Sequence, residues 1–160
     1  MRNRQKGFSL IELLIVVAII LIIAAIAIPN LLRSKMAANE ASAVASLRTY
    51  NTSIVAYQTT YGTDPSTNFV QLGPAVTPSA SGADLVDSLL GIAAPTKSGY
   101  TFAYTPDPAP VTGVYSVYTI IATPVTQNVT GQRRFFTNQS GVIRQTTDGT
   151  APTVSSNPIG

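Results

Sequence analysis

The sequence predicts an α+β protein, in which one long N-terminal helix, transmembrane and then amphipathic, packs on a C-terminal antiparallel β-sheet. Three observations support this fold class. Apolar residues dominate positions 8–28, no glycine occurs between Phe8 and Tyr61, and apolar and polar residues alternate beyond position 99. At 160 residues the chain is long enough for one domain of ordinary size.

The first element is an apolar helix over residues 8–28, which follows a basic stretch at positions 1–7. At 1.5 Å per residue this helix is about 31 Å long, which matches the hydrocarbon thickness of a bilayer. Three cations precede it, and the positive-inside rule therefore predicts a cytoplasmic N-terminus. A secretory signal that ends at Ala25-Ile26-Ala27 fits less well, because the apolar run is too long and contains an acidic residue. A plain single-span anchor is a second alternative.

The residues Lys6-Gly7-Phe8-Ser9-Leu10-Ile11-Glu12, the apolar run after them and the closing Pro29 resemble the N-terminus of type IV prepilins and type II secretion pseudopilins. The resemblance is close over about the first thirty residues. It extends more loosely over the whole chain as a helix followed by a β-rich region, the pilin fold. In this family a prepilin peptidase cuts after the glycine and methylates the new N-terminal residue. The resemblance thus implies a cleaved leader at residues 1–7, cleavage after Gly7 and methylation of Phe8.

Glu12 is the only ionisable side chain between Lys6 and Arg33. An unpaired carboxylate in a membrane is costly, so such a residue is a candidate for function, although Glu12 lies close enough to the span's end to reach the interface. Cleavage after Gly7 would give Phe8 a cationic α-amine four residues away, on the same helix face. The resemblance implies that Glu12 pairs with the Phe8 amine of another subunit and sets the register of a filament.

The amphipathic half of the same helix is expected over residues 29–61. Pro29 is its only breaker and predicts a kink. Gly62 is a natural stop. Apolar residues recur at spacings of three and four and predict a stripe that packs on the sheet: Val44, Leu47, Tyr50, Ile54, Tyr57 and Tyr61.

Residues 62–98 are expected to form a connecting loop with a short helix over 82–91, which has acids near its start and a glycine at its end. Asp84 and Asp87 are the only closely spaced carboxylates in the chain. A catalytic pair is conceivable, but favourable electrostatics at a helix terminus explain their spacing better.

The antiparallel sheet is expected over residues 99–147, and residues 148–160 form an irregular tail. Alternating or β-branched residues predict four strands, at 100–105, 114–123, 132–137 and 142–146, with a loop at 106–110 and a turn at Asn138–Gly141. Arg133, Arg134 and Arg144 could meet across the last hairpin as a basic patch, although a solvated edge is the commoner arrangement.

Composition excludes several classes of function. The chain has no Cys and no His, which excludes thiol chemistry, Cys/His zinc sites and imidazole catalysis. We expect no enzymatic activity, no cofactor and no metal, because no nucleophile–base set is available. The net charge of +3 comes from the three leader cations, and residues 8–160 hold seven basic and seven acidic residues. A nucleic-acid partner is therefore disfavoured, though left open.

The resemblance implies a structural type IV pilin subunit. Such a subunit is a single-pass inner-membrane precursor surrounded by lipid, and it later polymerises through its N-terminal helix into an extracellular homopolymer. The implied partners are other copies of the chain, the prepilin peptidase, a membrane assembly platform and a cytoplasmic ATPase. Two alternatives stay open: a major pseudopilin in a periplasmic filament, and a minor pilin that binds DNA or a surface. The sequence does not distinguish among motility, adhesion, DNA uptake and secretion.

Overall fold

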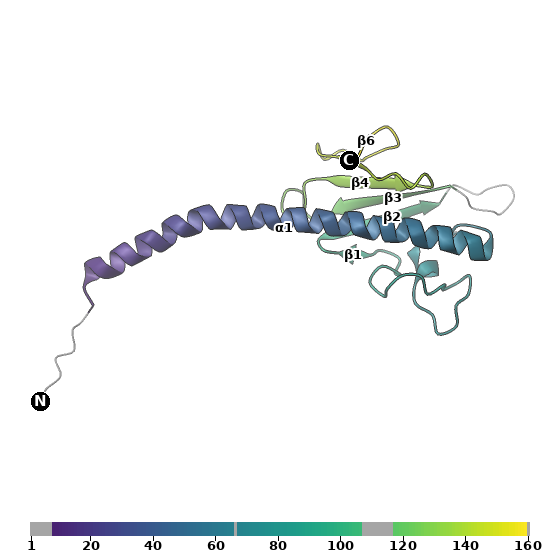
Figure 1. The fold of residues 1–160 in the computed structure, drawn as a ribbon, viewed down its shortest axis with the longest axis horizontal. Coiled ribbons are helices and arrows are strands. Elements are labelled where there is room, and N and C mark those ends of the chain that lie inside the picture. The colour runs from purple at the N-terminus through teal and green to yellow at the C-terminus, as the bar shows by residue number, and fades with distance from the viewer. Residues whose placement is uncertain (1–7, 66, 107–116, 160) are drawn as a thin grey trace, which may run out of the picture. The chain divides into compact units, whose positions relative to one another are not determined.

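The computed structural model describes residues 8–65, 67–106 and 117–159 (Figure 1). The chain forms a helix and a six-stranded sheet, which confirms the α+β prediction. The elements are α1 (Leu10–Tyr61), the 3₁₀ helix η1 (Phe69–Leu72), β1 (Thr96–Lys97), β2 (Tyr100–Pro106), β3 (Tyr118–Pro124), β4 (Arg134–Asn138), β5 (Arg144–Thr146) and β6 (Asn157–Pro158). The chain divides into two compact units, residues 1–35 and 36–160.

The first unit contains the N-terminal part of α1, which has no packed core of its own among its described residues. Every side chain from Phe8 to Lys35 is exposed except that of Ala24, which is half-buried. By length and composition α1 is a helix that could cross a membrane. The helix continues through Pro29 without interruption, and a kink there stays a prediction.

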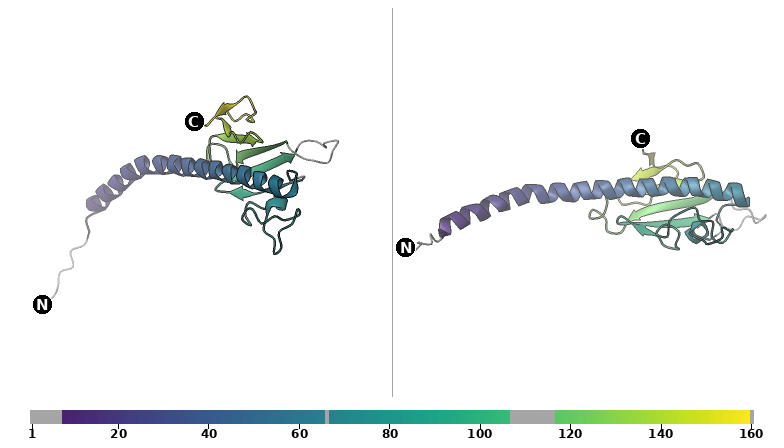
Figure 2. Two further views of the ribbon diagram at one scale, coloured as in Figure 1. Left: turned by 45° about the vertical axis from the view of Figure 1, so that its right-hand side comes forward. Right: turned by 60° about the horizontal axis from the view of Figure 1, so that its bottom comes forward.

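The second unit holds the hydrophobic core, between residues 36–61 of α1 and one face of the sheet (Figures 1 and 2). The strand order is β1-β2-β3-β4-β5-β6, and all neighbours are antiparallel. The predicted helix stripe is confirmed: its four central residues are at most 1% exposed, and Val44 and Tyr61 pack at its edges. The ring of Tyr50 stacks on that of Phe69, with 3.9 Å between the centroids, so η1 closes one end of the core.

The alternation predicted for the sheet is also confirmed. In β2, Tyr100 and Phe102 are buried, whereas Thr101 and Ala103 are exposed. The core-facing residues of β3 are also buried and meet the helix stripe. One face of the sheet therefore packs against α1.

The helix expected over residues 82–91 is wrong. Asp84 has φ +54°, outside the right-handed helical region. The N–H of Leu85 donates to the carbonyl of Leu72 (2.9 Å), so this part of the segment runs beside η1. A single turn forms only after it, where the N–H of Gly91 donates to the carbonyl of Asp87 (2.8 Å). The helix of the connecting loop is η1, capped by Asn68, whose side chain accepts a hydrogen bond from the N–H of Val70 (2.9 Å).

The sheet has more strands than expected. The predicted strands at 100–105, 132–137 and 142–146 correspond to β2, β4 and β5, with shifts of one or two residues at several ends. The strand predicted at 114–123 overlaps β3, but residues 114–116 lie outside the described residues, as do residues 107–110 of the predicted loop. Two-residue strands at each edge, β1 and β6, come from segments expected to be a loop and an irregular tail.

Candidate functional site

The residues expected to act in processing and assembly lie around the start of α1. Gly7 is outside the described residues. Phe8 is 81% exposed, and Glu12 lies in the first turn of the helix.

Glu12 caps its own helix. Its Oε2 accepts a hydrogen bond from the N–H of Ser9 at 2.9 Å. Ser9 precedes the first helical residue, so this is one half of a capping box, the Ser-x-x-Glu motif. The bond satisfies an N–H group that a helix start otherwise leaves without an acceptor, and it keeps the carboxylate where the helix dipole favours negative charge. The motif is visible in the sequence, but its capping role was not anticipated.

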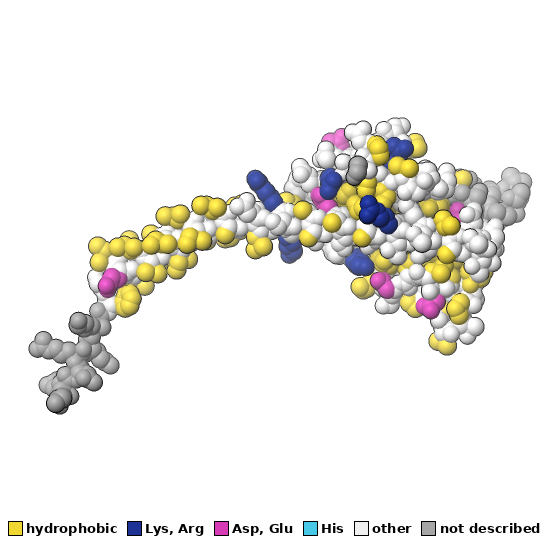
Figure 3. Space-filling view, in the orientation of Figure 1, with side chains coloured by type: hydrophobic (Ala, Val, Ile, Leu, Met, Phe, Trp, Pro, Cys, Tyr) yellow, Lys and Arg dark blue, Asp and Glu magenta, His cyan; other side chains and the backbone are white. Residues whose placement is uncertain are grey.

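Apolar side chains cover the N-terminal part of α1, as the space-filling view shows (Figure 3). A shallow groove on this surface is lined by Leu10, Leu13, Leu14, Val17, Ala18 and Leu21. The spacing of these residues places them on one helix face. The small side chain of Ala18 allows another helix to approach closely. This surface is therefore suited to lipid or to another apolar helix.

Of the two ion pairs among the described residues, the shorter joins α1 to Arg133, the residue before β4. Glu40 is 7% exposed, and its Oε1 accepts the N–H groups of Gln132 (2.8 Å) and Arg133 (3.0 Å). Its Oε2 accepts from Nε of Arg133 at 2.7 Å. Burial alone would raise the pKa of Glu40, but the bonds from Gln132 and Arg133 outweigh it and hold the pKa below its usual value. This contact fixes the helix on the sheet.

The basic patch that the sequence left possible for three arginines is therefore excluded for Arg133. Its guanidinium is engaged by Glu40, by Oε1 of Gln145 (2.8 Å) and by the ring of Phe135, whose centroid lies 5.4 Å from Cζ. Arg144 is also engaged, because its Nη1 donates to the carbonyl of Ser156 at 2.9 Å. These arginines stabilise the sheet and its C-terminal tail.

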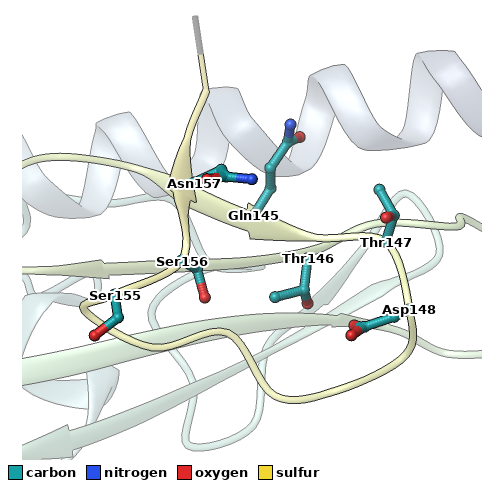
Figure 4. Close-up of a pocket in the computed structure, with 7 residues that line it drawn as sticks. All are labelled: Gln145, Thr146, Thr147, Asp148, Ser155, Ser156 and Asn157. Carbon is teal, nitrogen blue, oxygen red and sulfur yellow. The ribbon is translucent and has the colours of Figure 1, made fainter.

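A polar cavity of about 300 Å³ lies between β5 and β6 (Figure 4). Its walls are Gln145, Thr146, Thr147, Asp148, Ser155, Ser156 and Asn157. Several of these groups already bond within the tail: Oδ1 of Asp148 accepts from N and Oγ1 of Thr150, and Oγ of Ser156 accepts from N of Thr153. The cavity contains none of the residues expected to act in assembly.

Of the two closely spaced acids, Asp84 and Asp87, the second is held by local hydrogen bonds and by a lysine. Oδ1 of Asp87 accepts the N–H groups of Leu89 (3.0 Å) and Leu90 (2.8 Å), and its Oδ2 lies 3.6 Å from Nζ of Lys97. The bond from Leu90 is the largest influence that lowers the pKa of Asp87. Asp87 thus caps a single turn, and not the start of the helix that the sequence predicted over residues 82–91. In the part of the chain that the structure describes, no group of three or more acidic side chains could hold a metal ion.

Comparison with known proteins agrees with this arrangement. Residues 2–28 match the prokaryotic N-terminal methylation motif. With a long apolar helix ahead of an antiparallel sheet, this motif defines a protein of the prepilin class. The chain is also 37% identical, over 131 residues, to the type IV wide pilus major component PilA4 of Thermus thermophilus. The match covers 76% of the chain and 93% of that protein. The chain belongs to the type IV pilin family, as its N-terminal residues predicted. No solved structure matches it.

Family membership supports a role as a pilus subunit, with self-polymerisation and processing by a prepilin peptidase. The methylation motif and the long apolar helix also fit a membrane-anchored precursor. Pilins are in general structural proteins without enzymatic activity.

Proposed function

We propose that the chain is the structural subunit of a type IV pilus, cut after Gly7, methylated at Phe8 and polymerised through the N-terminal part of α1 into an extracellular filament. One observation carries this proposal. The N-terminal part of α1, over residues 10–35, is exposed and apolar and has a single acidic side chain, Glu12, whereas the second unit has a complete core of its own. The 37% identity to a wide pilus major component supports a pilus over a pseudopilus.

The exposed helix needs an apolar environment. Leu10 is 80% exposed and Ile23 is 61% exposed, and burying a side chain of this size contributes about 1.5–3 kcal/mol. The lipid bilayer supplies this environment for the precursor, whose N-terminus lies in the cytoplasm. A bundle of identical helices supplies it in the filament. Because the two environments are similarly apolar, the transfer between them is nearly neutral in free energy.

Glu12 gives the bundle its register. In the precursor, the bond from the N–H of Ser9 partly satisfies its carboxylate. Cleavage after Gly7 creates a cationic amine on Phe8, the residue next to Ser9. In the filament, this amine on one subunit pairs with Glu12 of a neighbour. Such a pair is strongly dependent on geometry in an apolar core, so it selects one axial position and adds little net stability.

Leader removal is therefore a gate to assembly. Before cleavage the nitrogen of Phe8 is an uncharged amide. The leader also carries Arg2, Arg4 and Lys6, which resist entry into an apolar bundle. The chain has no nucleotide-binding motif, so the motor must be another protein. An inner-membrane platform and a cytoplasmic ATPase complete the proposed machinery.

Two substitutions of Glu12 separate its capping from its charge. Glu12→Gln keeps an oxygen that can accept from Ser9, whereas Glu12→Ala removes both the acceptor and the charge. We expect both variants to insert into the membrane and both to abolish filaments, measured by the yield of sheared surface filaments. Filaments of normal yield from Glu12→Gln would show that capping suffices and that the registry pair is wrong.

Mass spectrometry of wild-type filaments tests processing directly. We expect an N-terminus at Phe8 that carries one methyl group. An intact leader in assembled filaments would contradict the gate. Imaging separates the alternatives, because a pseudopilus stays within the cell envelope and a minor pilin is scarce in sheared material.

A further inference from the structure

The charged residues of the first unit mark the two ends of the apolar stretch of α1. Between Glu12 and Arg33 the sequence has no ionisable side chain. The apolar surface continues up to Arg33, because Leu31 is 69% exposed and Leu32 is 54% exposed. At 1.5 Å per residue, the stretch from Leu13 to Leu32 measures about 30 Å, the thickness of the hydrocarbon layer of a bilayer. Placing Glu12 at one edge of this layer therefore places Arg33 at the other edge.

Two cations lie at the second edge, Arg33 and Lys35, and both side chains are exposed. Successive residues of an α-helix are rotated by about 100° and rise by about 1.5 Å. The two side chains therefore leave α1 on nearly opposite sides, at almost the same level along its axis. Figure 3 shows Lys and Arg side chains on both sides of α1 where the apolar stretch ends. The described residues form two ion pairs, and neither includes Arg33 or Lys35.

A partner that binds both cations must surround the helix. A protein docked on one side of α1 would reach one cation and leave the other in water, whereas the headgroup layer of a bilayer surrounds a spanning helix at one level. Lipid phosphate groups are anionic, and Lys and Arg side chains near a helix end extend toward them while their aliphatic stems stay against apolar groups. The positive-inside rule disfavours cations on the exported side of a span, so this pair needs another reason to be there. Binding to lipid phosphate is such a reason.

We infer that Arg33 and Lys35 bind lipid phosphate groups in the outer leaflet of the inner membrane and thereby fix the depth of the precursor in the bilayer. The inference rests on the proposed function, which places this helix in the inner membrane with its N-terminus in the cytoplasm. It adds the residues that hold the helix at one level and the lipid chemistry that they bind. The spanning stretch is then residues 13–32, about one turn further along the chain than residues 8–28.

A fixed depth has a consequence for processing. With the two cations in the outer headgroup layer, Glu12 lies at the cytoplasmic edge of the hydrocarbon layer and Phe8 lies in the cytoplasmic headgroup layer. The bond to be cut, which precedes Phe8, is then held outside the hydrocarbon layer at a constant level. Interfacial Lys and Arg side chains anchor spanning helices in this way. The cation pair therefore presents the leader to the prepilin peptidase from the opposite side of the membrane.

Solid-state NMR of the full precursor in bilayers of phosphatidylethanolamine and phosphatidylglycerol tests the contact. In a phosphate-free buffer the phosphorus nuclei belong to the lipid, and we expect them to dephase the signals of the Arg33 guanidinium carbon and of Cε of Lys35. Arg33→Lys identifies the Arg33 signal. Arg48, exposed in the second unit, is the matched control in the same sample and should keep its full signal. No dephasing at Arg33 and Lys35, or equal dephasing at Arg48, would overturn the inference.

Two double variants test the effect on processing, with the rate of leader removal by the prepilin peptidase measured in vesicles of the same lipids. Arg33→Gln with Lys35→Gln removes both charges, whereas Arg33→Lys with Lys35→Arg exchanges the residues and keeps the charges. One basic residue near an anionic lipid surface favours that position about fivefold. We therefore expect the glutamine pair to slow leader removal at least fivefold and the exchanged pair to be cut at the wild-type rate. Thermal unfolding of the second unit should be unchanged in both, since both positions are exposed.

Leader removal at the wild-type rate in the glutamine pair would contradict the inference and leave the proposed function intact. If that variant also failed to form filaments, the two cations would act between subunits and not on lipid. Equally slow removal in the exchanged pair would contradict a role for charge. Failure of the wild-type precursor to insert into the membrane, or absence of the wild-type chain from filaments, would overturn the proposed function itself.

Discussion

Replacing Glu40 tests whether its buried hydrogen bonds contribute more to the free energy of unfolding than an ordinary surface ion pair does. Glu40→Ala removes the acceptor of three hydrogen bonds, two from the backbone N–H groups of Gln132 and Arg133 and one from the Arg133 side chain. The Arg133 side chain is 37% exposed, so water can take over its guanidinium. The two N–H groups then lack an acceptor, at about 1–3 kcal/mol each. We expect a total loss of about 3 kcal/mol, the lower end of the range for breaking a buried pair.

Glu40→Gln should cost less, about 1–2 kcal/mol, because an amide oxygen can still accept from both N–H groups. The wild type gains its advantage from ionised Glu40, whose pKa in the folded state lies below the ordinary value of 4.5. This stability is present above pH 4.5 and is lost as the pH falls through the folded-state pKa. The free-energy difference between wild type and Glu40→Gln should therefore shrink on acidification.

The assay is denaturant and thermal unfolding of the full chain in detergent micelles at pH 7 and pH 4, monitored by near-UV circular dichroism. A loss of about 3 kcal/mol corresponds to a fall in Tm of about 11 °C for a unit of this size. Lys97→Gln is the control, since it removes the exposed pair with Asp87 and should cost at most about 0.5 kcal/mol. If Glu40→Ala matched this control, or if the advantage over Glu40→Gln grew on acidification, the reasoning would be refuted.

Three further variants test other parts of the second unit. Asp64 is 2% exposed, and burial raises its pKa from 3.8 to about 6, so its favourable contribution is present below pH 3.8 and lost as the pH rises through about 6. Asp64→Asn should therefore be more stable than wild type at pH 7.5, by up to about 3 kcal/mol, and lose most of this advantage at pH 4.5 in urea titrations; an advantage that did not change with pH would contradict the ionisation argument. A Cβ at Gly131 would lie 2.6 Å from Cζ of buried Tyr100, so Gly131→Ala should cost about 2–3 kcal/mol or more. Gly141→Ala, where a Cβ meets nothing within 4 Å but φ is +71°, should cost about 1 kcal/mol, and equal losses in thermal unfolding would argue against the clash.

Features that depend on local periodicity could be predicted from the sequence. The stripe that includes Leu47, Tyr50 and Ile54 is buried because residues three and four apart share a helix face. The alternation in β2 follows from the two-residue period of a strand. The N-terminal motif is local as well, which explains why residues 2–28 were sufficient to indicate the family.

Features that depend on contacts between distant residues were missed. Glu40 and Arg133 are 93 residues apart, and nothing near either residue signals their pairing, so the sequence indicated only a solvated edge or a basic patch for Arg133. The segment around Leu85 has helical composition, but the N–H groups of Leu85 and Val86 donate to the carbonyl of Leu72 and not to carbonyls within the segment. Tertiary packing here outweighs local helix propensity. Short edge strands such as β6 contain too few residues to show any period.

The two units are stabilised in different ways, so experiments can distinguish effects on folding from effects on assembly. The second unit buries its own core, so Glu40→Ala or Gly131→Ala should lower its unfolding temperature whether or not filaments form. The first unit buries nothing among its described residues, and its free energy depends on what surrounds it. Glu12 is exposed, so substituting it should leave the unfolding of the second unit unchanged and alter filament yield alone. A variant at this position that lowered the unfolding temperature and the filament yield in proportion would place Glu12 in the fold and remove the basis for assigning it to assembly.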